Sequence, residues 1–209
     1  TGVLAPNVLK LPMETDTEKV YEDVKAGLKE QFDFEMSAPI GCSNTYVLSV
    51  TPEVSEKYNL TKLSQLITQA PNLRLGCTTA FTQREDLLPK MEEFGINFKE
   101  VVGLEGNIRY QAITSGEVEV TDAYETDALV MKSNLVRLED DISFFPPYQA
   151  VNVFRSDVLE EYPELEDVLS LLDNAITTDE MLEMNYQVDV EGKTTEEVAH
   201  DFLASKGLI

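Results

Sequence analysis

The 209-residue chain has no tryptophan, a single histidine and only two cysteines. The histidine, His200, lies in "TTEEVAHDFLASKG", where helical spacing places it opposite Val198 and Phe202 and therefore toward solvent. A histidine-based metal site or a Ser-His-Asp triad needs partners that this sequence does not contain. Cys42 and Cys77 are too few for a disulfide framework and lack metal-ligand spacing, which leaves one bridge or two thiols open.

Positive charge is also scarce, with 16 lysines and arginines against 39 aspartates and glutamates and a formal net charge of −23. Such a field repels phosphate backbones and anionic membrane surfaces, which argues against a nucleic-acid-binding protein. The acidity attracts cationic ligands, although solubility alone also accounts for it. No apolar run approaches ~18 residues, so the sequence contains no candidate transmembrane helix.

What is present is an ordinary globular composition, 43% hydrophobic and 26% charged. The length allows one large domain or two lobes of ~100 residues each. Helical and strand patterns alternate along the chain, which predicts an α/β fold with mainly parallel strands. The predicted strands are 44–50, "LRLGCTT", "EVEVTDAYETDA", "RLEDD" and "YQAVNVFR"; the predicted helices are 16–31 after a Thr15/Glu18 capping box, 63–67, "REDLLPKMEEFG", "NIRYQAITSG", 157–175, and two that begin at the Thr177/Glu180 and Thr194/Glu197 capping boxes.

The stretch "DISFFPPYQAVNVFR" sets two phenylalanines, two prolines and a tyrosine directly before a strand pattern. Prolines cannot donate to a sheet ladder, so Pro146 and Pro147 cannot lie inside a central strand. The run therefore predicts a stiff, extended approach that aims Tyr148 in a fixed direction. Phe144 and Phe145 are expected to pack into a core beneath it.

Polar and aromatic side chains follow several of the predicted strands. In open α/β sheets, ligands bind outside the carboxyl ends of the strands. This placement indicates a site without naming its ligand, and it is shared by Thr78, Thr79, Arg84, Tyr124, Glu125 and Asp127.

Three tyrosines, Tyr46, Tyr124 and Tyr148, lie at strand ends or entries rather than in a helical stripe. Their rings could form an aromatic box for a methylated ammonium group, which cannot donate N–H bonds but gains roughly 0.5–2 kcal/mol per ring by cation–π attraction. Spacing alone equally allows that these are ordinary core or surface tyrosines.

Five motifs, taken in order, resemble one family of transport proteins: "SNTYVLSV", "FTQRED", "GLEGNIRYQAITSGEVEVTDAYETDA", "LEDDISFFPPYQA" and the tail "MLEMNYQVDVEGKTTEEVAHDFLASKGLI". They are similar to the substrate-binding components of ABC importers for glycine betaine, carnitine, choline and related osmoprotectants. The resemblance covers essentially the whole chain. The Asn-Thr-Tyr, Asp-Ala-Tyr-x-Thr-Asp and Phe-Pro-Pro-Tyr elements are specific together, whereas each alone is weak.

The resemblance implies that Tyr46, Tyr124 and Tyr148 form the ligand cage. It also implies that Arg84 of "FTQRED" holds the ligand carboxylate in betaine-binding members, a role that suits a guanidinium because it can fork two bonds onto a carboxylate. A structural alternative for Arg84 is a pair with Glu85 or another neighbour at the start of a helix.

Asn44 and Thr45 precede the first cage tyrosine, and the resemblance places them in the ligand site, although Asn44 could instead satisfy backbone groups in a turn. The chain departs from the family pattern at Cys42, where a bulky ring is usual, and at Glu125, where serine is common. Glu125 could contact an additional cationic or N–H group of the ligand, or only face solvent. A larger betaine such as carnitine, or a trimethylated amino acid such as ergothioneine, fits these departures.

The resemblance implies a two-lobed, type II periplasmic-binding-protein-like fold. Residues 47–145 would form one complete lobe, and residues 1–46 with 146–209 the remainder of the other, with hinge crossings near 44–50 and 146–153. In the family, β/α structure and a further cage tyrosine precede the position of Thr1, so we expect this lobe to be incomplete on its amino-terminal side and able to dimerise.

The expected mechanism is ligand-driven closure of the hinge, followed by recognition of the closed form by the membrane permease of an ABC importer. No cofactor, metal ion or nucleic acid takes part. The expected location is extracytoplasmic, either in a periplasm or tethered at the cell surface as a lipoprotein or by fusion to the permease. Two alternatives remain: an enzyme on the same fold that uses Asp122, Glu125 and Asp127 as acids, and a ligand-sensing module that signals to a partner.

Overall fold

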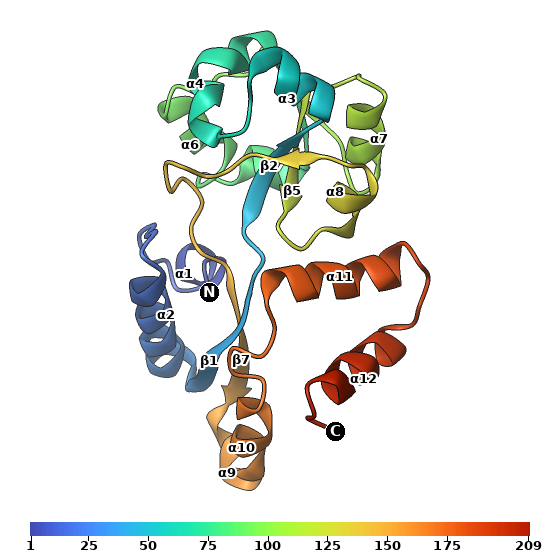
Figure 1. Cartoon of the computed structure of the whole chain (residues 1–209). Helices are drawn as coiled ribbons and strands as arrows, with labels where there is room; N and C mark the ends of the chain where they lie inside the picture. Colours follow the sequence, from blue (N-terminus) through green and yellow to red (C-terminus); the bar gives the residue numbers. More distant parts are fainter. The chain divides into compact units, whose positions relative to one another are not determined.

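The computed structural model describes all residues from 1 to 209, and the chain divides into two compact units (Figure 1). Unit 1 consists of Thr1–Thr45 and Pro146–Ile209, and unit 2 consists of Tyr46–Phe145. The chain therefore passes between the units twice, once after Thr45 and once after Phe145. Each unit has its own sheet and its own helices.

Unit 2 is built on a five-stranded sheet with the order β4-β3-β5-β2-β6. Strands β3, β4 and β5 are parallel, as the strand–helix alternation predicts, whereas β2 runs antiparallel to both β5 and β6. The expected strand "RLEDD" (137–141) is wrong in its bounds, because the strand here is the two-residue β6, which includes Arg137 but begins at Val136. The strands are β2 (Tyr46–Val50), β3 (Arg74–Cys77), β4 (Glu100–Gly103), β5 (Val120–Tyr124) and β6 (Val136–Arg137).

The helices of unit 2 pack around an apolar core that contains the fully buried Leu48, Leu75 and Val120. One prediction is wrong in its boundaries: the helix expected over "REDLLPKMEEFG" begins only at Leu88, and a separate short helix forms just before it where a loop was expected. Thr78 starts that short helix, because its hydroxyl accepts a bond from the backbone N–H of Phe81. The helices are α3 (Pro52–Tyr58), α4 (Leu66–Gln69), α5 (Thr79–Gln83), α6 (Leu88–Glu93), α7 (Ile108–Thr114) and α8 (Ala128–Lys132), with 3₁₀ turns at Leu63–Gln65 and Ala70–Asn72.

Unit 1 is built around an antiparallel pair of strands, β1 (Phe34–Ser43) and β7 (Gln149–Arg155). Helix α2 (Thr17–Phe32) packs on the pair through Val20, Val24 and Leu28, whose spacing predicts this face. The capping prediction is off by one residue, because Asp16 rather than Thr15 accepts the N-terminal bond of this helix. A one-turn helix, α1 (Leu4–Asn7), precedes it.

The carboxyl-terminal part of unit 1 is helical, as predicted, but the helix expected over 157–175 is split in two. Pro163 lies at the break, because a proline restricts the residue before it away from helical geometry. Both predicted capping boxes, at Thr177 and Thr194, are confirmed, and His200 is exposed as predicted. The helices are α9 (Ser156–Glu161), α10 (Glu164–Ser170), α11 (Thr178–Asp189) and α12 (Thr195–Ser205).

Cys42 and Cys77 are both buried free thiols, which decides the alternative that the sequence left open. Burial raises the pKa of the Cys77 thiol to about 12 and also raises the pKa of the Cys42 thiol, so both side chains are neutral packing groups. None of the helices is long and apolar enough to cross a membrane. No group of three or more His, Cys, Asp or Glu side chains is arranged to hold a metal ion.

Candidate functional site

Unit 2 brings two of the predicted cage tyrosines together. Tyr46 begins β2 and Tyr124 ends β5, and the antiparallel register places them directly opposite each other. Their ring centroids lie 4.4 Å apart at an angle of 37°, and the Tyr124 hydroxyl donates to the Tyr46 hydroxyl at 2.7 Å. Sequence positions 78 residues apart thus form one aromatic pair.

Two further rings of unit 2 pack on Tyr46. Phe81 meets it edge-on, with centroids 5.5 Å apart, and Phe145 stacks at 6.1 Å. Burial in this ring cluster raises the pKa of Tyr46 well above its ordinary value, with the Tyr124 hydrogen bond adding to the effect. Tyr46 therefore stays a neutral phenol, and its attraction for a cation comes from the ring quadrupole rather than from a phenolate.

Arg84 lies against the same ring cluster, with its guanidinium carbon 5.7 Å from the centroid of the Tyr46 ring. It follows α5 in extended conformation, because the helix ends at Gln83. The side chain pairs with Asp86, which accepts from Nε at 2.9 Å and from Nη2 at 2.5 Å. The neighbour that pairs with Arg84 is thus Asp86 rather than Glu85.

A buried polar network holds the turn that carries Tyr124. Arg109 donates through Nε to the backbone oxygen of Asp122 at 3.0 Å and through Nη2 to the Asp127 carboxylate at 3.2 Å. The Tyr110 hydroxyl donates to the same carboxylate. The backbone N–H of Asp127 donates to the backbone oxygen of Tyr124 at 3.1 Å. The "AYETD" turn is therefore clamped at both ends, which gives the Tyr124 ring a defined direction.

The three acids proposed for an enzyme have different surroundings. Asp122 is fully buried and accepts from the backbone N–H and the hydroxyl of Thr78, so it ties the end of β3 to β5. Burial raises the pKa of Asp122, against the opposing effect of Arg109. Asp127 caps α8, while Glu125 is half-exposed and its carboxylate forms no ion pair. Asp122 and Asp127 therefore act in structure, and Glu125 is the one carboxylate of the three without such an engagement.

Unit 1 brings together the other predicted residues, Asn44, Thr45 and Tyr148. The Thr45 hydroxyl accepts from the backbone N–H of Tyr148 at 3.1 Å, and the Asn44 backbone N–H donates to the backbone oxygen of Tyr148 at 3.0 Å. Ser43 and Thr45 share a hydrogen bond between their hydroxyls at 2.8 Å. The backbone of Tyr148 is thus held on both sides by the segment that precedes Tyr46.

Gly2 is a contributor that the sequence reasoning missed. A Cβ placed on Gly2 would lie 2.3 Å from Cδ1 and 2.5 Å from Cε1 of the Tyr148 ring, and 2.6 Å from the oxygen of Pro147. The Gly2 N–H also donates to that oxygen at 3.0 Å. The ring of Tyr148 therefore rests on the backbone of Gly2, and only a residue without a side chain permits this contact.

The turn before the two prolines depends on Asp140. Its carboxylate accepts from the backbone N–H groups of Phe144 and Phe145, both at 2.9 Å. Both phenylalanine side chains are buried, which confirms their predicted core role. A carboxylate four to five residues upstream is a turn signal that could have been recognised in "EDDISFF".

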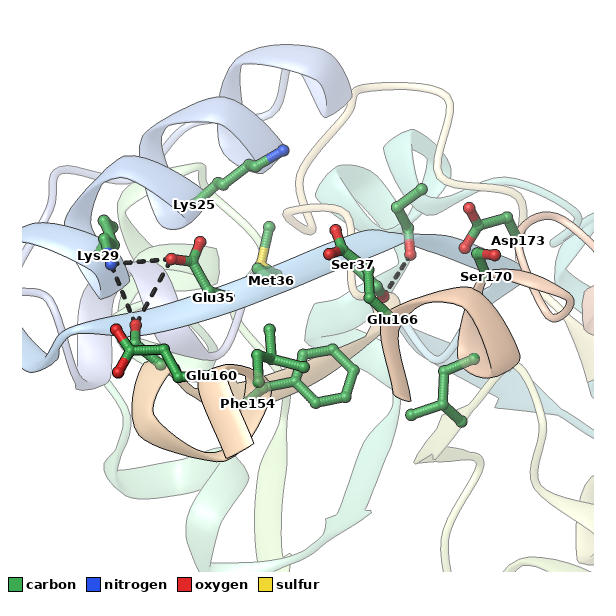
Figure 2. A pocket seen from close by; sticks show the side chains of 14 residues that line it. Lys25, Lys29, Glu35, Met36, Ser37, Phe154, Glu160, Glu166, Ser170 and Asp173 are labelled. Atoms are coloured by element: carbon green, nitrogen blue, oxygen red, sulfur yellow. Dashed lines mark hydrogen bonds and ion pairs between the residues drawn. The ribbon is translucent and has the colours of Figure 1, made fainter. Parts of the chain in front are cut away.

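Unit 1 also contains a pocket of about 480 Å³ between α2, β1, α9 and α10, which includes none of the predicted site residues. Figure 2 shows its mixed lining, with Met36 and Phe154 among charged side chains. Lys29 bonds to Glu35 at 2.8 Å and to the Ser156 hydroxyl at 3.0 Å, so part of its charge is already paired internally. The pocket shows no arrangement specific for one ligand.

Comparison with known proteins matches most of the chain to one family of substrate-binding domains. Residues 5–205 match the family model described as the substrate-binding domain of the ABC-type glycine betaine transport system. The chain is 34% identical, over its full length, to the ergothioneine transport permease/ergothioneine binding protein EgtU of Helicobacter pylori, and spans 37% of that protein. It is 32% identical over 190 residues to the carnitine transport binding protein OpuCC of Listeria monocytogenes, covering 90% of this chain and 62% of the relative.

Among solved structures, one described as a glycine betaine/carnitine/choline ABC transporter superposes with a TM-score of 0.86 at 32% identity. The match covers 99% of this chain and 76% of the other. This similarity confirms the predicted α/β, type II periplasmic-binding-protein-like fold. The matched family model and the relative from Listeria monocytogenes are described as substrate-binding or transport binding proteins. The chain belongs to the family of substrate-binding domains of ABC-type glycine betaine transport systems.

Proposed function

We propose that the protein is a solute receptor for a quaternary-ammonium compound of the glycine betaine, carnitine or choline class, and that it delivers this ligand to an ABC importer. The observation that carries the proposal is the Tyr46–Tyr124 ring pair with Arg84 beside it. Neutral phenol rings attract a trimethylammonium group that cannot donate hydrogen bonds. A guanidinium at the same place supplies the partner for a ligand carboxylate.

The proposed site also includes Tyr148, Asn44 and Thr45 of unit 1. Ligand binding would favour a closed arrangement of the two units, because only closure brings groups from both onto one molecule. The chain segments around Thr45–Tyr46 and Phe145–Pro146 would act as the hinge. The permease would then recognise the closed form, and no bond in the ligand would be made or broken.

A second candidate ligand is a larger trimethylated amino acid such as ergothioneine. The relative named as an ergothioneine binding protein matches this chain over its whole length, which supports this candidate. Glu125 offers a half-exposed carboxylate next to Tyr124 that could accept from a ring N–H of such a ligand. Glycine betaine has no N–H or O–H group that could donate to it, whereas choline could donate only through its hydroxyl.

The proposed partner is the membrane permease of the importer, and the proposed location is extracytoplasmic, with tethering as a lipoprotein or by fusion to the permease. We also propose dimerisation through unit 1, which is supported by the two edges of its two-stranded sheet, where no further strand pairs. A sensing role would differ from transport in its partner, because a sensor signals through a regulatory protein. Co-purification with permease or with a signalling protein separates the two.

The test is titration calorimetry of the protein with choline, glycine betaine, carnitine and ergothioneine. Because the chain has eight tyrosines and no tryptophan, tyrosine fluorescence provides an independent readout of ligand at the rings. Binding of at least one trimethylammonium ligand, with loss in Tyr124→Ala, supports the proposal. Binding of none of the four compounds contradicts it.

A further inference from the structure

The segment between α10 and α11 runs along β1 and brings the start of α11 to the end of that strand (Figure 1). The backbone N–H of Ile176 donates to the oxygen of Ile40 at 3.0 Å. Gly41 permits this close approach, because a Cβ at that position would lie 2.7 Å from the oxygen of Ile176. The register places Thr178, the first residue of α11, beside Ser43, the last residue of β1.

Three hydroxyl groups connect the start of α11 to the backbone of Tyr148. The hydroxyl of Thr178 accepts from the backbone N–H of Ser43 at 3.1 Å, and the hydroxyls of Ser43 and Thr45 share a hydrogen bond at 2.8 Å. The hydroxyl of Thr45 accepts from the backbone N–H of Tyr148 at 3.1 Å. All four residues belong to unit 1. Thr178, Ser43 and Thr45 thus form a hydroxyl series that ends at Tyr148.

The hydroxyl series restrains the peptide plane before Tyr148. A backbone N–H has one direction within a planar peptide group, so a fixed acceptor orients that plane. The Thr45 side chain is β-branched and has few rotamers, and its bond to Ser43 holds it in the one that faces this N–H. Ser43 is held in turn by Thr178, whose helix start is fixed by the capping box at Thr177. Contacts of the Tyr148 ring act in addition, since they restrain the side chain rather than the peptide plane.

A ring that is already oriented in the free protein loses little conformational freedom when a ligand binds, and this preorganisation raises affinity. We infer that Thr178 is a positioning residue of the ligand site: through Ser43 and Thr45 it fixes the backbone of Tyr148, and it thereby sets the affinity for a quaternary-ammonium ligand. This inference deepens the proposed function and rests on it. Thr45 contributes to the site in the same way, through the backbone of Tyr148.

The test compares variants that remove or keep one hydroxyl of the series in the full 209-residue chain. Thr178→Val removes the hydroxyl with little change of shape, whereas Thr178→Ser keeps it. Thr45→Val removes the acceptor of the Tyr148 N–H itself. Thr195→Val is the matched control, because Thr195 also follows a capping-box threonine at the first position of a helix but is exposed and lies outside the hydroxyl series. Thermal unfolding of each variant shows whether the fold is retained.

Two quantities are measured for each protein. Calorimetry gives the dissociation constants of choline, glycine betaine, carnitine and ergothioneine. Nuclear magnetic resonance on protein isotopically labelled at the tyrosine nitrogens gives the amide-exchange rate of Tyr148 in the free protein, with the signal assigned by its absence in Tyr148→Phe. Amide exchange reports the restraint on the Tyr148 N–H whether or not a ligand binds.

For Thr45→Val we expect amide exchange at Tyr148 to accelerate about tenfold and the bound ligands to weaken about tenfold, the scale of one lost hydrogen bond. Thr178→Val acts further along the series, so both effects should be about threefold in the same direction. Thr178→Ser should restore both quantities to within about twofold of the wild type, and Thr195→Val should change neither by more than about twofold. In a Tyr148→Ala background, Thr178→Val should change affinity by less than about 1.5-fold, because no ring is left to position.

Unchanged exchange at Tyr148 in Thr178→Val would overturn the inference. An equal loss of affinity for Thr178→Val with and without the Tyr148 ring would overturn it as well, and would show that Thr178 only supports unit 1; in both cases wild-type binding leaves the proposed function standing. If the wild type binds none of the four compounds, the proposed function fails and the inference about affinity fails with it, while the exchange rates still decide whether the hydroxyl series fixes Tyr148. Should Thr178→Val unfold, Ser43→Ala interrupts the same series and decides by the same two quantities.

Discussion

The two units hold their tyrosines by different means. In unit 2, Tyr46 and Tyr124 lie opposite each other on neighbouring strands of a five-stranded sheet, and Tyr46 is itself among the largest fully buried side chains of the chain. In unit 1, Tyr148 precedes a two-stranded sheet, and its position depends on Thr45, Asn44 and Gly2. One aromatic group is therefore positioned by side-chain packing and the other by backbone hydrogen bonds and a close backbone contact.

Both units expose large apolar side chains, such as Val168 of α10 at 56% in unit 1 and Ile108 of α7 at 57% in unit 2. Unit 1 exposes eight such side chains and unit 2 exposes five. A small two-stranded sheet cannot cover as much apolar surface as a five-stranded one. The rings of Tyr46 and Tyr124 are therefore held in place by the packed core of unit 2. The ring of Tyr148 depends on fewer contacts, so we expect a local change to displace it more easily.

The largest loss of stability is expected when Arg109 of unit 2 is removed. Arg109→Met leaves the buried Asp122 and the Asp127 carboxylate without their cation, which should lower the free energy of unfolding by about 3–5 kcal/mol. Arg74→Met is the matched control, because the Arg74–Glu119 pair is partly exposed and should cost only about 1 kcal/mol. Denaturant unfolding followed by circular dichroism measures both, and equal losses would contradict the special role of the buried network.

The contact beneath Tyr148 is tested by Gly2→Ala. The new Cβ would overlap the Tyr148 ring, so the ring must move; we expect stability to fall by about 1–3 kcal/mol and ligand affinity to fall at least tenfold. Gly103→Ala is the control, because nothing lies within 4 Å of a Cβ at that position. Calorimetry and thermal unfolding provide the two readouts. Retained affinity in Gly2→Ala would show that Tyr148 can move without loss of binding.

The ring pair itself is tested by two changes at Tyr124. Tyr124→Ala removes a ring and should weaken a trimethylammonium ligand about tenfold, whereas Tyr124→Phe removes only the hydroxyl bond to Tyr46 and should weaken it less than about threefold. Titration calorimetry distinguishes the two variants. A larger loss in Tyr124→Phe than in Tyr124→Ala would mean that the hydroxyl pair, not the ring, binds the ligand.

The smallest expected effect concerns pH. The hydrogen bonds from Arg74 hold the pKa of Glu119 below its ordinary value of 4.5, so the ionised form is favoured in the folded state. This contribution is fully present above about pH 4.5 and disappears as pH falls through the lower, folded-state pKa. Because the pair is partly exposed, it amounts to less than about 1 kcal/mol. Unfolding measured from pH 6 to pH 3 should show a shallower decline in Glu119→Gln; identical slopes would refute the contribution.

The local features of the fold were largely predictable. Val20, Val24 and Leu28 identify the buried face of α2, and the capping boxes at Thr177 and Thr194 identify two helix starts. Predicted helix boundaries were wrong where two neighbouring residues can both cap the helix. Asp16, for example, caps α2 in place of Thr15. The antiparallel course of β2 also escaped prediction, because strand direction depends on long-range pairing rather than on local pattern.

Some residues of the candidate site were predictable from the sequence, and others were not. Motif resemblance singled out Tyr46, Tyr124, Tyr148 and Arg84, and the structure places three of them in one ring cluster of unit 2. Gly2 and Asp86 were missed. Neither carries a pattern of its own, since a glycine reveals its purpose only when a ring lies against it, and an acid near an arginine has many possible partners.

The sequence by itself determined the α/β class, the helix faces, the rigid approach to Tyr148 and the family to which the chain belongs. These depend on periodicity, on proline geometry and on motifs, all of which are local in the chain. Only the tertiary structure decided that Tyr46 lies opposite Tyr124, that Asp86 rather than Glu85 pairs with Arg84, and that both cysteines are free thiols. The physical reason is that side-chain contacts between distant segments follow from strand register and packing, which no short stretch of sequence specifies.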